Sequence, residues 1–256
     1  MTPRDYRDFA VHIAQEAGNI VRSMRGKAAI TAHKTHFTDF VTQADLESEK
    51  YLIQAIKHRF PTHQIISEED SVQQSMQEEA WVIDPLDGTL NFATGIPLYG
   101  VMVAFFQRHV CVASAIVLPE FDETYSACVN EPATCNGKTI RCGTNSDFDK
   151  SVGHIGSSSS NRKIALLQRV NARYPQVWVN SFGCAAYAIC AVASGKRDWL
   201  VAHGKLWDSA AGSLILSQAG CVVTDCEGEP WTWQSTSFRA CTPGLVSSLN
   251  EFTRGL

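Results

Sequence analysis

Several patterns that mark large classes of protein are missing from this sequence. Its 256 residues contain no apolar run approaching the about 18 residues of a membrane-spanning helix, so no transmembrane segment is predicted. No run of five or more lysines and arginines occurs and the formal net charge is −4, so we expect neither nucleic acid nor an anionic membrane as a partner. Residues 1–18 contain acids and no apolar stretch, which excludes a typical secretory signal.

A C-x-x-C pair is also missing, although nine cysteines are present. The alternatives are a disulfide framework, a zinc site or buried free thiols. The cysteines are scattered singly, mostly among small or apolar neighbours, which favours free thiols in a reducing, cytoplasmic environment. Since the chain has no basic cluster, a polyanionic substrate would need local help, most simply from bound cations.

What the sequence does contain is typical of a globular protein, with 45% hydrophobic and 19% charged residues. Residues 3–24 carry apolar side chains at three- and four-residue steps after Thr2, which predicts a capped amphipathic helix. A second helix is predicted over 43–58, with Leu46, Ile53 and Ile56 buried. Further expected elements are strands at 64–66, 81–84, 100–106, 111–117, 125–129, near 178 and at 221–224, a hairpin turn at Asn136-Gly137, and helices over 162–172, 185–195 and 208–220. From about residue 150 the expected helices and strands alternate. This change predicts an α+β half, residues 1–147, followed by an α/β half, residues 148–256.

Acidic residues gather where the expected strands end. The segment WVIDPLDGTLNF, residues 81–92, ends an apolar run in Asp84 and Asp87, and Glu68-Glu69 follow the strand at 64–66. Asp45 and Asp208 stand at helix starts. Each has an ordinary structural alternative as a turn, a helix cap or a partner of the helix dipole. Because crowded carboxylates repel one another unless a cation lies among them, the set as a whole favours a site for a hard ion such as Mg²⁺.

The chemistry that suits such a site is phosphate-ester hydrolysis with paired metal ions. Gly88 would let the backbone approach a phosphate, and the N–H groups of Gly88 and Thr89 would bind its oxygens. The Thr89 hydroxyl would hold the attacking water. A rival is the haloacid-dehalogenase type of phosphatase, which ends an apolar strand in D-x-D-G-T and uses the first Asp as a covalent nucleophile. Here the acids are one residue further apart, in D-P-L-D-G-T.

Four segments together resemble the inositol monophosphatase family, within the lithium-sensitive, magnesium-dependent phosphatases. They are DFVTQAD (39–45), ISEED (66–70), DPLDGTLNF (84–92) and WDSAAGSLILSQAG (207–220). The resemblance covers roughly residues 5–225. It implies a layered α-β-α-β-α sandwich of the sugar-phosphatase type, a homodimer, two to three Mg²⁺ ions per subunit and a small phosphorylated metabolite as substrate.

The resemblance also implies roles for individual residues. The metal ligands would be Glu68, Asp84, the carbonyl of Leu86, Asp87 and Asp208. Glu68, Thr89, Asp45 and Lys34 would serve catalysis, Asp45 by accepting a hydrogen bond from Thr89 and Lys34 from a metal-binding loop. Glu69 would lie behind the ligands and orient them. The substrate would contact Gly88, Thr89, Gly183, Cys184, Ala185 and Asp208.

One expected substrate contact is missing. Inositol phosphatases of the family carry a glutamate shortly before the W-D motif, and this chain has Ala202 and His203 there. Inositol monophosphate or a related sugar or polyol phosphate is the expected substrate, with nucleoside 3′,5′-bisphosphate or histidinol phosphate as alternatives. A non-catalytic regulatory binding module is a further alternative.

Overall fold

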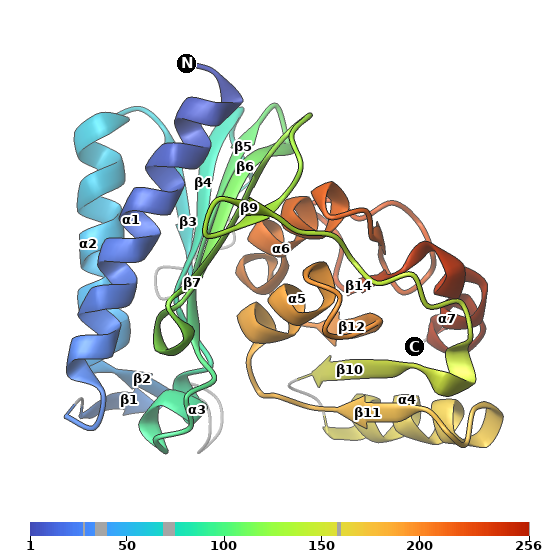
Figure 1. Cartoon of the computed structure of the whole chain (residues 1–256). Helices are drawn as coiled ribbons and strands as arrows, with labels where there is room; N and C mark the ends of the chain where they lie inside the picture. The colour runs from blue at the N-terminus through green and yellow to red at the C-terminus, as the bar shows by residue number, and fades with distance from the viewer. Residues whose placement is uncertain (28, 34–39, 69–74, 158–159, 256) are drawn as a thin grey trace.

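The computed structural model describes residues 1–27, 29–33, 40–68, 75–157 and 160–255. Within this part of the chain, helices and sheets alternate in five layers (Figure 1). The order is a helix pair, a large sheet, a second helix pair, a small sheet and a third helix pair. The predicted layered sandwich is therefore confirmed.

The large sheet is formed by the first half of the chain. Its described strands lie in the order β3 (Gln64–Ser67), β4 (Glu79–Asp87), β5 (Gly100–Gln107), β6 (Val110–Leu118), β7 (Glu123–Cys128), β8 (Thr134–Cys135) and β9 (Lys138–Thr139). Only β3 and β4 are parallel in this described sheet. The central strands are buried on both faces, which explains their nearly continuous apolar sequences. The predicted hairpin turn joins β8 to β9, with Asn136 and Gly137 both at positive φ.

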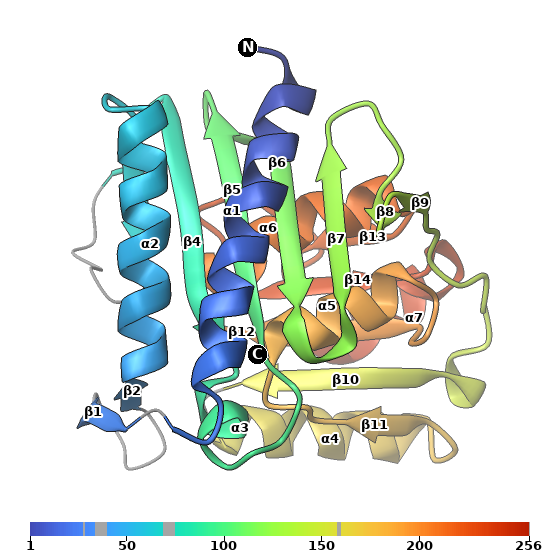
Figure 2. The same ribbon diagram turned by 60° about the vertical axis from the view of Figure 1, so that its left-hand side comes forward.

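One face of the large sheet is covered by α1 (Pro3–Met24) and α2 (Gln43–Arg59), as Figure 2 shows. Thr2 caps α1 and forms a capping box with Asp5, as the sequence indicated for Thr2. In α2 Ile56 is buried, but Leu46 is exposed and Ile53 only partly buried, so that part of the prediction was wrong. Leu52 takes the buried place instead. A two-stranded ribbon, β1 (Ile30–His33) and β2 (Phe40–Thr42), leads into α2.

The other face of the large sheet packs on α5 (Ala185–Ala193) and α6 (Leu206–Gln218). These helices also cover the small sheet, whose described strands lie in the order β11 (Trp178–Asn180), β10 (Val152–Ser157), β12 (Trp199–His203), β14 (Phe238–Cys241) and β13 (Val222–Thr224). The outermost layer is α4 (Ser160–Arg173) and α7 (Val246–Thr253). A single apolar core joins the large sheet, α5, α6 and the small sheet, and the division of the chain at residues 147 and 148 stays a prediction.

Shorter elements complete the description. The helix α3 (Thr89–Ala93) and three 3-10 turns, Pro119–Phe121, Phe148–Lys150 and Pro243–Leu245, join the longer elements. All nine cysteines are free, and Cys135 and Cys142 are only partly buried. Among the described residues, no helix combines the length and the apolar character needed to cross a bilayer.

Candidate active site

The strand predicted at 81–84 is β4, which continues to Asp87, so Asp84 and Asp87 both lie near its end. In a regular strand, residues three apart point to opposite faces of the sheet. The pairing shows how β4 avoids this, because Asp84 is opposite Met102 and Asp87 is opposite Gly100, which leaves one extra residue on β4. This bulge turns Asp87 toward the side of Asp84. Ser48 of α2 supports it by donating a hydrogen bond to the carbonyl of Pro85 at 2.7 Å.

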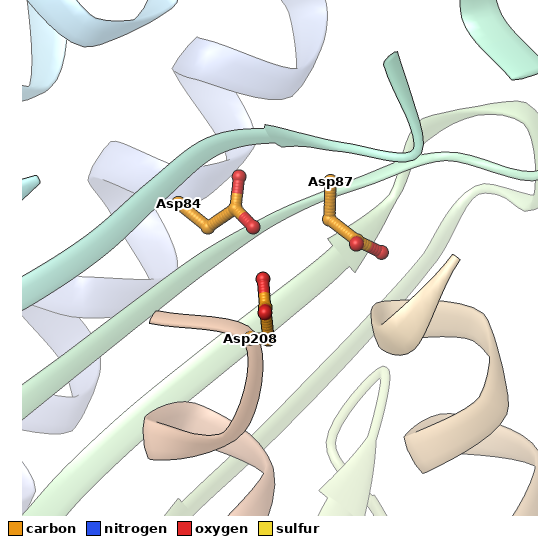
Figure 3. A group of neighbouring side chains, drawn as sticks. All are labelled: Asp84, Asp87 and Asp208. Atoms are coloured by element: carbon orange, nitrogen blue, oxygen red, sulfur yellow. The ribbon is translucent and has the colours of Figure 1, made fainter. Parts of the chain in front are cut away.

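Asp208 joins these two acids from α6, a helix of the central layer. One carboxylate oxygen from each of Asp84, Asp87 and Asp208 lies within 4.8 Å of the others (Figure 3). The helix α6 begins at Leu206, two residues earlier than predicted, and Asp208 in its first turn accepts a hydrogen bond from the N–H of Lys205 at 2.6 Å. A Cβ at Gly204 would lie 2.1 Å from Asp208 Oδ2, so only glycine permits this placement.

The three acids destabilise one another's charged forms. Burial raises the pKa of Asp84 well above its usual range, and the neighbouring Glu68, Asp87, Asp208 and Asp45 raise it further. Burial also raises the pKa of Asp87, against the opposing effect of hydrogen bonds from Cys184 and Ala186. For Asp208 burial and the charge of Asp87 raise the pKa to about 7. The site therefore brings together carboxylates whose charged forms are destabilised by burial and by mutual repulsion.

The donor set fits a hard divalent cation. Asp84 is 1% exposed, and its Oδ2 has no hydrogen-bond partner in the described part of the chain. A buried carboxylate oxygen without a partner is costly, and a cation removes that cost. Since the three converging residues offer only oxygen atoms, Mg²⁺ suits them better than zinc or copper.

The predicted substrate segment, Gly183 to Ala185, holds Asp87 in place. Asp87 Oδ2 accepts a hydrogen bond from the thiol of Cys184 at 2.8 Å and another from the N–H of Ala186 at 2.8 Å. Cys184 is the N-cap residue of α5 and is buried. These two donors fix one oxygen of Asp87, which leaves Oδ1 as its oxygen for other partners.

A second hydrogen-bond network lies beside the acids. Asp45 Oδ2 accepts hydrogen bonds from the N–H and hydroxyl of Thr42 at 2.8 and 2.5 Å, which makes a capping box at the start of α2. Its Oδ1 accepts a hydrogen bond from the hydroxyl of Thr89 at 3.0 Å. Asp45 thus caps a helix and also binds Thr89. Thr89 follows Gly88, which has φ +85°. Any larger residue in place of Gly88 would put its Cβ 2.7 Å from the carbonyl oxygen of Leu98.

Asn91 is a positioning residue that the sequence analysis did not identify. Its amide donates hydrogen bonds to the carbonyl oxygens of Leu98 and Phe182 at 2.8 and 2.9 Å. It thereby ties the DPLDGTLNF segment to the substrate segment. The only sequence signal for this role was the position of Asn91 inside the DPLDGTLNF motif. Its partner Phe182 is 91 residues away, so the contact could not be predicted from the sequence.

The remaining predicted residues are placed as follows. Glu68 directly follows β3, and its charge raises the pKa values of Asp45, Asp84, Asp87 and Asp208, so it lies close to the acid cluster. Lys34 and Glu69 lie outside the described residues. Ala202 packs on the core that contains α5 and α6, whereas His203 is buried on the opposite face beside Cys226, with 3.7 Å between Nε2 and Sγ.

Comparison with known proteins agrees with this geometry. Residues 3–253 match the model of the inositol monophosphatase family. The chain is 31% identical to inositol monophosphatase 1 of Bos taurus, over 89% of this chain and 86% of that protein. It is also 31% identical to a protein named putative Nus factor SuhB of Neisseria meningitidis serogroup B, over 95% and 96% of the two chains. An IMPase structure from Thermotoga maritima superposes with a TM-score of 0.89 at 27% identity, covering 97% and 96%.

The family match decides between the two kinds of phosphatase that the D-x-x-D-G-T segment left open. It covers the acid cluster, the Thr89 network and the substrate segment alike. The match also favours a phosphatase over a non-catalytic module, because relatives that align with most of this chain are named inositol monophosphatases. The chain belongs to the inositol monophosphatase family of metal-dependent phosphatases.

Proposed function

We propose that the protein is a Mg²⁺-dependent phosphomonoesterase that hydrolyses a small phosphorylated metabolite by attack of water, without a covalent intermediate. The observation that carries this proposal is the convergence of Asp84, Asp87 and Asp208, in which the buried Oδ2 of Asp84 has no hydrogen-bond partner among the described residues. Cations among the acids offset the cost of their buried negative charge. A phosphoryl group is the part of a substrate that binds such cations best.

The proposed ligands of two to three Mg²⁺ ions are Glu68, Asp84, the Leu86 carbonyl, Asp87 and Asp208. Bound Mg²⁺ supplies an acidified water and stabilises charge on the leaving oxygen. We also propose that Lys34 serves catalysis from a metal-binding loop and that Glu69 orients the metal ligands. Leu86 contributes its backbone carbonyl only, so its side chain serves packing and is 1% exposed.

The protein groups would move the proton of the attacking water. The Thr89 hydroxyl has two acceptors, Asp45 Oδ1 and the Leu86 carbonyl, each at 3.0 Å. If the Leu86 carbonyl binds a cation, Asp45 remains as the acceptor of the Thr89 proton. The Thr89 oxygen then has a lone pair free to accept a hydrogen bond from the attacking water, along which the proton of the water can move. The backbone N–H groups of Gly88 and Thr89 would bind the phosphate oxygens.

The proposal is tested by phosphate release from a panel of phosphomonoesters with Mg²⁺, with excess chelator and with millimolar Li⁺. The panel contains inositol 1-phosphate, sugar phosphates, adenosine 3′,5′-bisphosphate and histidinol phosphate. We expect activity that requires Mg²⁺ and falls with Li⁺. Full activity in chelator, or a phosphoaspartyl group trapped on Asp84, would contradict the proposal.

The assembly and the location of the protein are part of the proposal. We propose a homodimer, as the family resemblance implies, and a cytoplasmic location, because nine free cysteines suit a reducing compartment. Light scattering of the purified protein should give twice the chain mass of 28.1 kDa.

A further inference from the structure

One corner of the small sheet, formed by His154, Gly156 and Ala202, carries a buried histidine that the proposed mechanism does not use. His154 lies on β10, is 3% exposed, and faces α5 and α6. Its neighbours on that face are Gly156 and Ala202, which pair in the parallel register of β10 and β12. Alternate residues point the other way, since Gly153 lies against Trp199 and Ile155 belongs to the outer core.

The contacts of His154 fix which ring nitrogen carries the proton. Nδ1 accepts a hydrogen bond from the backbone N–H of Phe182 at 3.4 Å, and the two rings stack with centroids 5.0 Å apart at 12°. Burial, together with the charges of Lys163 and Arg197, lowers the pKa of His154 to about 4. The imidazole is therefore neutral near neutral pH, and Nε2 carries the hydrogen.

The same contacts fix where this donor points. Nε2 would lie 2.9 Å from a Cβ at Gly156, and the same Cβ would lie 3.7 Å from Ala202 Cβ. The ring thus extends along β10 toward the end of the strand, which runs toward the large sheet (Figure 1). The neighbouring β12 ends at His203, next to the Gly204 that touches Asp208. Phe182, which holds the ring, precedes the segment that binds Asp87.

The charge around this corner is opposite to that of the acid cluster. Among the described residues, the charged groups that act on His154 are the cations Lys163 and Arg197. The Arg197 guanidinium lies 5.6 Å from the centre of the Phe182 ring. The glutamate expected before the W-D motif would have accepted hydrogen bonds from substrate hydroxyls. In place of that glutamate, the face of the small sheet that covers α5 and α6 has the apolar Ala202, beside the Nε2–H donor of His154.

We propose that His154 is a specificity-determining residue, whose Nε2–H donates a hydrogen bond to an acceptor-only oxygen on the alcohol part of the substrate. The substrate class is a phosphomonoester whose alcohol carries a second anionic group, a carboxylate or phosphate. This inference rests on the proposed phosphomonoesterase function. A hydroxyl of a neutral polyol would bind less well at this corner, because none of the described residues that act on His154 is an acid that could accept its hydrogen.

The experiment compares two substrates that differ at one group, 3-phosphoglycerate and glycerol 3-phosphate, in the full-length protein with Mg²⁺. Because hydrogen bonds to charged groups are the stronger ones, we expect kcat/KM to favour 3-phosphoglycerate by about 10- to 150-fold. His154→Phe keeps the stacked ring and should bring the ratio close to one. His154→Gln restores an N–H donor near Nε2 and should recover most of the preference. His203→Phe, on the opposite face of the same sheet, should leave the ratio unchanged.

Binding of phosphonates separates this inference from the proposed function. Calorimetry of the wild type should show tighter binding of 3-phosphonopropionate than of propylphosphonate, a preference that His154→Phe removes. Equal binding of the two, or a kcat/KM ratio that His154→Phe leaves unchanged, overturns the inference even in an active enzyme. Absence of all phosphate release overturns the proposed function, and the phosphonate pair then still decides on His154.

Discussion

The acid cluster and the His154 corner differ in charge and in what the sequence says about them. Asp84, Asp87 and Asp208 crowd negative charge around a buried oxygen, whereas His154 is a neutral donor near two cations. The motifs of the family cover the acid cluster, and the departure from the family falls at the other corner. In the proposed function the two regions have separate roles: the acid cluster would carry out the reaction, and the His154 corner would select the substrate.

The largest effect should come from removing one charge at the acid cluster. Asp87→Asn keeps the shape of the side chain but weakens cation binding. Because a bound metal supplies several kcal/mol of transition-state stabilisation, we expect kcat/KM to fall by on the order of 10³-fold or more. Steady-state phosphate release measures this. Circular dichroism should show the same folded structure, because Asn retains the hydrogen bond from the Ala186 N–H.

The matched control is Asp122→Asn, which removes an exposed carboxylate paired with Arg22. Exposed ion pairs contribute little, so both activity and stability should stay close to those of the wild type. If Asp87→Asn behaved like Asp122→Asn, the acid cluster would have no part in catalysis.

The next effect concerns the proton path. Thr89→Val removes the hydroxyl between Asp45 and the proposed water, and positioned proton transfer contributes about 10²- to 10⁴-fold to rate. We expect a loss of that size in kcat with little change in KM. Thr89→Ser keeps the hydroxyl and should retain most of the activity. Equal losses in both variants would show that Thr89 acts through packing alone.

The sequence predicted the acids and most of the elements because both depend on local pattern. The helix at 3–24, the turn at Asn136-Gly137 and the gathering of carboxylates all followed from spacing and residue type. The bulge in β4 did not, since it arises from pairing with Met102 and Gly100 on a neighbouring strand. The exposure of Leu46 was missed for a similar reason, because the buried stripe of α2 depends on how the helix is rotated against the sheet.

The His154 corner was beyond sequence reasoning for a related reason. Ala202 and His203 were equal candidates for the position of the missing glutamate. Which of them faces α5 and α6 depends on the register of β12 against β10 and β14. The roles of His154 and Asn91 likewise depend on Phe182, which lies close to them only in the folded chain. Residues that act through distant partners leave little trace in a single sequence.

A smaller effect is expected when the cation is removed and the pH is changed. Burial and mutual repulsion raise the pKa values of Asp84, Asp87 and Asp208, the last to about 7, above the about 4 of an unfolded Asp. Between these values the folded, metal-free protein binds more protons than the unfolded chain, so its stability should fall as pH rises from about 4 to about 7.

Mg²⁺ should reverse that loss at the upper end of the range. At 100 times its dissociation constant a ligand stabilises by about 2.7 kcal/mol, which corresponds to a Tm increase of about 5–10 °C for a chain of this size. Differential scanning fluorimetry with and without Mg²⁺ at pH 5 and pH 8 measures this. The increase should be larger at pH 8. A Tm that is independent of Mg²⁺ at both pH values would show that the acids bind no cation.

The smallest effect should come from the thiol that links the acid cluster to the substrate segment. Cys184→Ala removes one donor to Asp87 Oδ2 and leaves the Ala186 N–H in place. One net hydrogen bond corresponds to about 1 kcal/mol, so the Mg²⁺ concentration for half-maximal activity should rise about 2- to 10-fold, with kcat changed less. Cys184→Ser keeps a donor and should stay near the wild type. Cys190→Ala, which removes an equally buried thiol from the same helix, should leave the Mg²⁺ requirement unchanged, because Cys190 donates no hydrogen bond to Asp87 in the described structure. If Cys184→Ser and Cys184→Ala raised the Mg²⁺ requirement equally, the volume of the sulfur atom, and not its hydrogen bond, would hold Asp87 in place.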